Sequence, residues 1–134
     1  MILRFEPNVV ITCDVQGGSV HPDHIVAHPV TRRVIVRLRE QYSWLQWLCL
    51  TGLPREHTAH WPRKVFGFPP ERIHAVIDVS AYLEIEKAAV HAHLSVRRDV
   101  EEHNYDQWMF WPEEHFSFFQ ESHSPPVEDL LHGI

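Results

Sequence analysis

Three ionisable side chains fall within four residues of the segment His21-Pro22-Asp23-His24. Near pH 7 an imidazole can bind a metal or carry a proton, and a carboxylate beside it can orient its ring. If a helix begins near Pro22, His24 lies in its first turn and can reach a metal with one ring nitrogen. Asp23 can then orient a neighbouring imidazole, and His21 can act in the same space as a proton donor or electrophile. The spacing therefore predicts a metal ligand beside a proton donor.

Other interpretations of these histidines stay open. A histidine in a polar turn is more often a cap or a surface group than a metal ligand, and for His28 alone a structural role is favoured. His24 and His28 are four residues apart, so they share a helix face and a two-histidine metal site is also geometrically possible. Further pairs with a loosely metal-like spacing, more often solvated than ligating, are His57/His60 and His91/His93.

A strand and a helix must position the segment. Residues 8–14 form a nearly continuous apolar run that ends before Gly17-Gly18, which is typical of a strand buried on both faces. A helix is predicted from Pro22 to about residue 41, with a kink or a split first turn at Pro29. Its apolar stripe is predicted at Val26, Val30, Val34 and Leu38. In open α/β sheets ligands bind at the carboxyl ends of strands, where this segment places its histidines.

The rest of the chain alternates between the two kinds of element, which predicts an α/β fold. Residues 53–70 contain four prolines without a clear period, which indicates a functional loop or a family-specific insertion. Ser80 is predicted to cap the helix that follows it. Further strands are predicted at residues 44–50, 75–79 and 115–119, and further helices at residues 81–93 and 97–108.

Composition excludes several classes of protein. The chain has 134 residues, of which 44% are hydrophobic, and this suits a single domain with its own core. A net charge of −6 argues against nucleic acid or an anionic membrane as the main partner. No apolar run is long enough to cross a membrane, and the start lacks the pattern of a secretory signal. Cys13 and Cys49 lie in apolar runs and are predicted to be buried free thiols of a reducing, cytoplasmic compartment.

The order of strand, Gly-rich turn, His-Pro-Asp-His and helix resembles the second half of the LmbE-like, or PIG-L, N-deacetylase family. The resemblance covers nearly the whole chain, and residues 53–70 match least. Later segments that resemble the family are residues 77–83 and 87–89, the His-x-Ser element at His93, the Glu114-His115-Phe116 triplet and residues 128–134.

The resemblance implies a Rossmann-like, three-layer α/β sandwich with a mainly parallel sheet. It also implies a hydrolase that uses zinc or another divalent metal to remove the acetyl group from N-acetylglucosamine-type substrates. His24 resembles the metal-ligating histidine of the family. His21 resembles the histidine that stabilises the tetrahedral oxyanion or protonates the leaving amine, and Asp23 the carboxylate that orients and charges that histidine. His93 matches a downstream histidine to which we assign no role.

The chain departs from the family pattern in three ways. The family's N-terminal His-Pro-Asp-Asp motif, which supplies a histidine ligand, an aspartate ligand and the general base, is not found here. His24 is then one of the three protein ligands that catalytic zinc normally needs. Val20 also replaces the usual glycine before His21, which restricts the backbone there, and Ser19 stands where a larger residue is common.

We therefore expect residues 1–134 to be a single domain that forms the C-terminal portion of such a deacetylase, with little activity alone. An exposed sheet edge would favour a homo-oligomer or pairing with a separate N-terminal half. Residues 53–70 and the missing half would set the substrate. The alternative is a non-catalytic metal-binding or protein-interaction module of the same fold. Hydrolysis by a serine or cysteine nucleophile is disfavoured because the chain has no Gly-x-Ser-x-Gly element.

Overall fold

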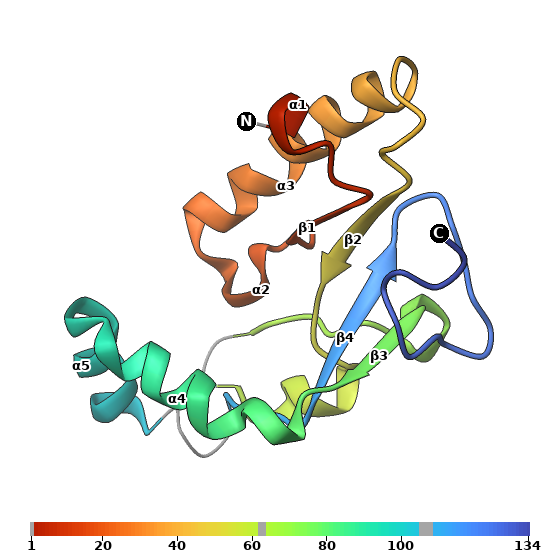
Figure 1. Ribbon diagram of the computed structural model, residues 1–134. Helices are drawn as coiled ribbons and strands as arrows, with labels where there is room; N and C mark the ends of the chain where they lie inside the picture. The colour runs from red at the N-terminus through yellow and green to blue at the C-terminus, as the bar shows by residue number, and fades with distance from the viewer. Residues whose placement is uncertain (1, 62–63, 105–108) are drawn as a thin grey trace. The chain divides into compact units, whose positions relative to one another are not determined.

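The computed structural model describes residues 2–61, 64–104 and 109–134, which divide into two compact units (Figure 1). The first unit comprises residues up to 76 together with 115–134, and the second comprises residues 77–114. The first unit contains α1 (Ile2–Phe5), β1 (Val9–Cys13), α2 (Gly17–Val20), α3 (Pro22–Arg39), β2 (Trp47–Thr51) and the 3-10 helices η1 (Arg55–His60) and η2 (Pro70–Arg72). The second contains η3 (Ser80–Tyr82), α4 (Leu83–Ala92) and α5 (Leu94–His103). Strands β3 (Ala75–Asp78) and β4 (Glu113–Phe118) have residues in both units.

The strands form one open, mixed sheet in the order β1-β2-β4-β3. β1 and β2 are parallel, in a register that pairs Val9 with Trp47 and Ile11 with Cys49. β2 and β4 are antiparallel, with Cys49 opposite Phe118. The predicted α/β class is confirmed, and the sheet combines a parallel pair with an antiparallel one. β1 lies at an edge of the sheet, so among the described residues its outer side has no strand partner.

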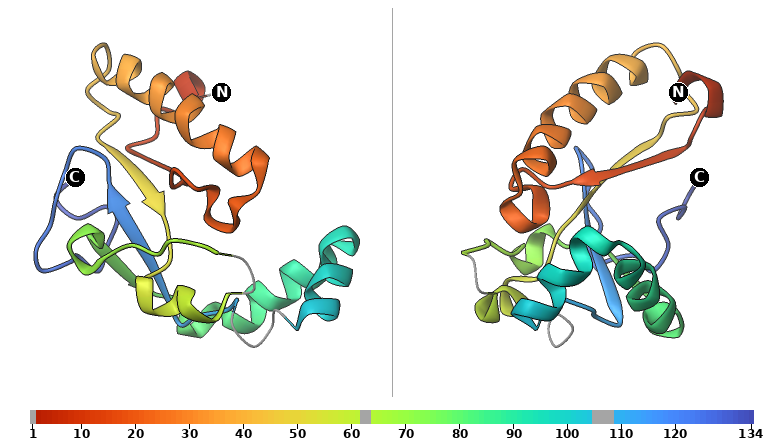
Figure 2. Two further views of the ribbon diagram at one scale, coloured as in Figure 1. Left: turned by 180° about the vertical axis from the view of Figure 1, so that it is seen from behind. Right: turned by 90° about the vertical axis from the view of Figure 1, so that its left-hand side faces the viewer.

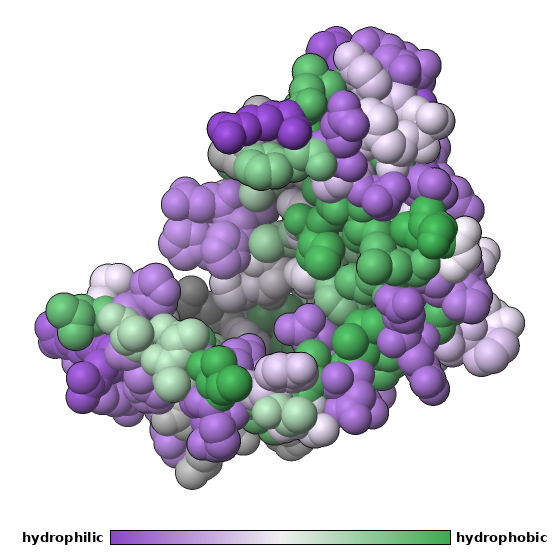
Figure 3. All heavy atoms as spheres, in the orientation of Figure 1, coloured by the Kyte–Doolittle hydropathy of each residue, from purple (hydrophilic) through white to green (hydrophobic). Residues whose placement is uncertain are grey.

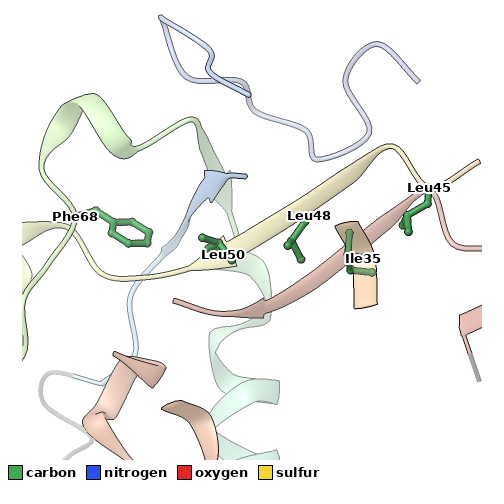
Figure 4. Packing of buried hydrophobic residues seen from close by; sticks show 5 residues of the cluster. All are labelled: Ile35, Leu45, Leu48, Leu50 and Phe68. Carbon is green, nitrogen blue, oxygen red and sulfur yellow. The ribbon is translucent and has the colours of Figure 1, made fainter. Parts of the chain in front are cut away.

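The hydrophobic core of the first unit lies between α3 and one face of this sheet (Figures 2 and 4). Ile35 of α3 packs in a cluster with Leu48 and Leu50, which point to the same face because side chains alternate along a strand. Leu45 and Phe68 complete the cluster. On the opposite face of β2, the Trp47 ring stacks on His123 with centroids 5.1 Å apart and meets Phe118 edge-on at 4.5 Å.

The apolar stripe predicted for α3 does not face this core, so that prediction is wrong. Val26, Val30 and Val34 are 59%, 56% and 39% exposed, whereas Ile35 and His28 are buried. Residues four apart advance about 40° around a helix axis, so a stripe spaced by four drifts, and only Leu38 at its end packs against the core. The helix also continues through Pro29 and is not split there.

Several predicted boundaries shift. β2 begins at Trp47 rather than at residue 44. Ser80 does not cap α4, because it lies in η3 and its backbone N–H donates to Oδ1 of Asp78 at 2.9 Å. α5 ends before Asn104, which adopts a left-handed conformation with φ 53°. The predicted end of that helix, residues 105–108, lies outside the described residues.

The stretch 53–70 is less irregular than its sequence pattern predicts. η1 lies inside it, and its ends are joined by a parallel bridge between Pro54 and Phe68. Arg55 donates its N–H to the carbonyl of Phe68 at 2.9 Å, and Phe68 donates to the carbonyl of Leu53 at 2.7 Å. Residues 62–63 lie outside the described part of the chain. Nowhere in the described ranges is a helix both long enough and apolar enough to cross a bilayer.

Candidate functional site

The connection from β1 to α3 is organised by a buried carboxylate. Asp14 follows the last residue of β1 and is only 4% exposed. Its Oδ1 accepts the backbone N–H groups of Gln16 and Gly18, both at 3.0 Å, and its carbonyl oxygen accepts the N–H of Gly17 at 3.0 Å. An aspartate that bonds the amides after it forms a turn by itself, so this residue folds the chain back toward the start of α3.

The two glycines allow that turn to lie against the helix. Gly17 and Gly18 have φ values of +67° and +64°, in the left-handed region. A Cβ at Gly17 would lie 2.5 Å from the backbone nitrogen of Ile25 and 2.6 Å from Cβ of His24. No other residue type fits such a close approach. The turn is therefore held in contact with the first residues of α3, where the candidate histidines lie.

His21 begins α3 as its N-cap. Nδ1 of its ring accepts the backbone N–H of Asp23 at 3.3 Å, so the ring proton of neutral His21 is on Nε2. The cap interpretation of this histidine, left open by the sequence, is thus observed. Pro22 occupies the first turn, where its missing N–H costs nothing.

His24 lies one turn further and is oriented by the Gly-rich turn. Its Nδ1 lies 3.1 Å from the carbonyl oxygen of Gly17. Because a carbonyl oxygen only accepts hydrogen bonds, Nδ1 carries the proton in this contact and Nε2 keeps its lone pair. Metal-ligating histidines usually donate their second ring nitrogen to a carbonyl or carboxylate in this way. The rings of His21 and His24 are both exposed, and their centroids lie 5.3 Å apart.

The structure brings His21, Asp23 and His24 together at the carboxyl end of β1, as the spacing predicts. Asp23 contacts the His21 ring through its backbone N–H, which donates to Nδ1 of His21. The role of the Asp23 carboxylate in orienting His21 stays a prediction.

His28 has the structural role that the sequence favoured. It is 6% exposed, and its Nδ1 lies 3.0 Å from the carbonyl oxygen of Cys13. This contact ties α3 to the end of β1. Within the described ranges, no three or more His, Cys, Asp or Glu side chains are grouped so that they could hold a metal ion. The donor His24 therefore has the orientation of a ligand, but the described residues do not complete a metal site.

The sequence interpretation missed the role of Gln16. Its Nε2 donates to Oδ2 of Asp14 at 3.3 Å and to the carbonyl oxygen of Phe66, and its Oε1 accepts the N–H of Phe66 at 3.0 Å. The side-chain amide thus pairs both backbone groups of a residue fifty positions away. The Phe66 ring itself is 62% exposed, with Nζ of Lys64 5.2 Å from its centroid. An aspartate three residues before Gly-Gly was the local signal for the turn, but nothing local indicated the contact with residues 53–70.

The remaining candidate groups lie apart from this cluster in the sequence. The ring of His57 meets that of His115 edge-on, with centroids 5.8 Å apart, and the side chain of His60 lies outside the described residues. His91 and His93 are at the end of α4 in the second unit. Both cysteines are free thiols. Burial raises the pKa of Cys49 to about 12, and burial with the negative charge of Asp14 raises the pKa of Cys13, so neither thiol is activated as a nucleophile.

In a comparison with known proteins, the chain is similar in sequence to several sugar deacetylases. A 1D-myo-inositol 2-acetamido-2-deoxy-alpha-D-glucopyranoside deacetylase of Mycolicibacterium smegmatis is 34% identical over 110 residues, covering 69% of this chain and 38% of that protein. The deacetylase of the same name from Mycobacterium sp. (strain KMS) is 32% identical over 102 residues, covering 66% and 33%. A deacetylase of this name from Saccharopolyspora erythraea is 30% identical over 105 residues, which cover 69% of this chain and 35% of that protein.

The chain spans about a third of the length of the curated relatives it matches. No protein-family model matches it.

Proposed function

We propose, from the premise that this chain belongs to the LmbE-like family of N-acetylglucosaminyl deacetylases, that it is the C-terminal portion of a zinc-dependent enzyme of that kind. In this proposal residues 1–134 form one domain of a Rossmann-like, three-layer fold with a mainly parallel sheet. The substrate is a small N-acetylated sugar, and the enzyme is cytoplasmic, with neither nucleic acid nor a membrane as partner. His24 is one metal ligand, and His21 and Asp23 are the catalytic residues.

One observation carries the proposal. The imidazole of His24 is exposed, its Nδ1 is bonded to the Gly17 carbonyl, and its Nε2 is left with a lone pair beside the ring of His21. A capping or purely structural histidine has no need for an oriented, exposed Nε2. The contrast is His28, which uses the same kind of Nδ1 contact but is buried.

The chemistry of the first turn of α3 fits amide hydrolysis. When water attacks the acetamide carbonyl, negative charge develops on its oxygen, and the C–N bond then breaks as the amine takes up a proton. Nε2–H of His21 can donate to that oxygen or to the leaving nitrogen. The amino end of α3 adds positive partial charge there, and Asp23 resembles the family carboxylate that orients this histidine. Removing one oxyanion donor typically costs about 2.7–4 kcal/mol of barrier.

In this proposal, the two remaining metal ligands and the general base are supplied by a polypeptide segment other than the residues described in this structure. The open edge of β1 supports this. Ile11 on β1 is 50% exposed, and hydrophobic side chains gather over β1 and β2 on the sheet face away from α3 (Figure 3). A separately encoded N-terminal half, or a second copy of the chain, could cover such a surface. For the non-catalytic metal-binding alternative, no described group of three donors offers support.

A chimera tests the catalytic roles. This chain would replace the part that it matches in the Mycolicibacterium smegmatis deacetylase, and acetate release from 1D-myo-inositol 2-acetamido-2-deoxy-alpha-D-glucopyranoside would be measured with added zinc. We expect activity that His24→Ala abolishes and that His21→Ala lowers by about 10²–10³-fold. His132→Ala, at an exposed imidazole of the C-terminal segment, should leave the activity unchanged. A folded chimera without activity would contradict the proposal.

Zinc titration of the chain alone tests the incomplete site. We expect weak binding that His24→Ala removes, as for a single imidazole. Cobalt can replace zinc to report the coordination geometry. A visible spectrum typical of tetrahedral cobalt, together with tight zinc binding, would show that the chain holds a closed site and that the other ligands are not missing.

A further inference from the structure

The carboxylate of Asp14 has no part in the proposed chemistry, yet it is among the most buried polar groups of the chain, at 4% exposed. Burying a carboxylate is costly unless hydrogen bonds replace its water. Here both oxygens are used: Oδ1 accepts the N–H groups of Gln16 and Gly18 at 3.0 Å, and Oδ2 accepts Nε2 of Gln16 at 3.3 Å. The donors all come from the turn, so the carboxylate determines the turn's shape.

That turn presents one particular acceptor to the candidate ligand. With the N–H groups of Gln16 and Gly18 directed at Asp14, the carbonyl of Gly17 faces His24 and takes the proton of its Nδ1 at 3.1 Å. A Cβ built on Gly17 would lie 2.6 Å from Cβ of His24, so the turn packs directly against this residue at the glycine. Asp14 and the His24 ring therefore contact the two ends of one peptide unit: Asp14 accepts the N–H of Gly18, and His24 contacts the carbonyl of Gly17.

The second oxygen extends the same network to the loop. Oδ2 of Asp14 holds the amide of Gln16 in the orientation in which Nε2 and Oε1 meet the carbonyl and the N–H of Phe66. An amide turned by 180° would present donor to donor at Phe66. One buried side chain thus orients both a candidate metal ligand and the loop whose sequence indicated a role in substrate choice.

We propose that Asp14 is a positioning residue that holds His24 in its Nδ1–H tautomer, with Nε2 free for a metal, and that through Gln16 it keeps the segment around Phe66 beside the same turn. The proposal rests on the proposed function only in taking His24 as a metal ligand. The tautomer and the loop contact are properties of the metal-free chain.

The ring tautomers can be read from the nitrogen chemical shifts of the metal-free chain by long-range proton–nitrogen NMR at a pH where the histidines are neutral. We expect Nδ1–H for His24 in the natural chain. In Asp14→Ala the turn loses its acceptor, and His24 should shift to the Nε2–H form that imidazoles prefer in water. Asp14→Asn keeps an Oδ1 acceptor for the two backbone amides and should retain Nδ1–H.

His28 is the internal control, because its Nδ1 contact with the Cys13 carbonyl does not involve the turn. Its tautomer should be the same in every variant. If Asp14→Ala does not fold, Asp14→Glu keeps the charge but moves the oxygens, and the same shift of His24 is expected there. A folded Asp14→Ala or Asp14→Glu chain in which His24 remains Nδ1–H overturns the proposal. So does loss of Nδ1–H in Asp14→Asn.

Gln16→Ala tests separately the two effects proposed for Asp14, on the tautomer of His24 and on the position of the segment around Phe66. It should leave the tautomer of His24 unchanged but raise the hydrogen-exchange rate of the Phe66 amide at least about tenfold, as Asp14→Ala also should. If the hydrogen-exchange rate of the Phe66 amide is unchanged in both variants, Asp14 and Gln16 do not hold the segment around Phe66, and that part of the proposal is overturned. In the active chimera, Asp14→Ala should weaken zinc binding by about 10–100-fold, the usual effect of losing a group that orients a ligand. An inactive chimera with the expected tautomer shifts would count against the proposed function and not against the role of Asp14.

Discussion

Val20 has a backbone conformation that a β-branched residue rarely adopts. Its φ is +62°, in the left-handed region, and it immediately precedes His21. Such a conformation costs an L-residue about 1–2 kcal/mol, and strain of this kind concentrates at functional sites. The resemblance to the family, in which glycine is usual at this place, leads us to expect a restricted backbone before His21. The turn demands a glycine-like backbone, and this chain adopts it with a valine.

We therefore expect Val20→Gly to stabilise the protein. Relief of the left-handed strain outweighs the greater flexibility of glycine in the unfolded chain, which costs about 0.4–1 kcal/mol, so the net gain should be about 0.5–1 kcal/mol in urea unfolding. Val15→Gly is the matched control, since Val15 is exposed and does not adopt a positive φ. That variant should lose stability. Equal effects of the two substitutions would mean that Val20 is not strained.

His74 is a buried imidazole whose acceptor nitrogen is in use. It is 9% exposed, and its Nδ1 accepts the backbone N–H of Phe118 at 2.9 Å. Burial, aided by the neighbouring His123 and Arg72, lowers the pKa of His74 below its usual 6.5. A protonated ring has donors at both nitrogens and cannot keep this bond to β4.

This lowered pKa predicts that stability falls in mild acid. Below about pH 6.5 the unfolded chain binds the proton of His74 more readily than the folded chain does, so the free energy of unfolding decreases as pH falls toward the folded-state pKa. Urea unfolding at pH 7.5, 6.5 and 5.5 measures the slope. His74→Asn keeps an acceptor without a titrating ring and should flatten it, whereas His132→Asn should not. A slope unchanged in His74→Asn would assign the acid sensitivity to other groups.

At the scale of elements, the packing of the β1–α3 turn against α3 depends on one glycine rather than on two. Gly17 and Gly18 share a positive φ, but a Cβ at Gly18 would meet nothing within 4 Å. Gly17→Ala should destabilise the protein by about 2–3 kcal/mol, because it combines backbone strain with a clash against the helix backbone. Gly18→Ala should cost less than Gly17→Ala, because it meets only backbone strain at φ 64° and ψ −77° and no neighbouring atom. Thermal or urea unfolding of the pair checks this, and equal losses would contradict the close approach.

The rotation of α3 about its own axis is a second feature at this scale. Ile35 is fully buried and Val30 is 56% exposed. Ile35→Ala should cost about 2–5 kcal/mol of unfolding free energy, as for other buried aliphatic residues. Val30→Ala should change it by less than about 0.5 kcal/mol. If the two losses were similar, the stripe through Val26 and Val30 would be packed, as the spacing of its valines predicts.

At the scale of the whole molecule, the two units differ in how much they bury. The main hydrophobic cluster belongs to the first unit, and β2 alone contributes Leu48, Cys49 and Leu50 to its buried residues. α4, in the second unit, has no buried residue, and its Ile85 is 66% exposed. Elements with few buried apolar contacts open more easily than core strands.

We accordingly expect the amides of α4 to exchange with deuterium faster than those of β2. Amides of α3 around Ile35 serve as the helical reference, since they belong to a helix that packs on the core. Hydrogen exchange followed by NMR or mass spectrometry measures the protection. Protection of α4 equal to that of β2 would mean that α4 opens only when the whole chain unfolds.

What the sequence determined by itself is local. The apolar run before Asp14 predicted β1, and Pro22 marked the start of α3. The His21-Pro22-Asp23-His24 motif indicated both the position of the candidate site and the family. These features depend on residues within one or two turns of each other, where capping and helix initiation are decided by neighbouring side chains. The prediction that this strand is buried on both faces is wrong, because no residue of β1 is buried and Ile11 is 50% exposed.

The tertiary structure decided the rest. It turned the buried face of α3 to Ile35 and His28, placed β4 between β2 and β3, and joined Gln16 to Phe66 across fifty residues. Periodicity does not distinguish two apolar faces of one helix, because which face is covered depends on the strands available to pack against it. The orientation of His24 likewise depends on a carbonyl that only the folded turn presents.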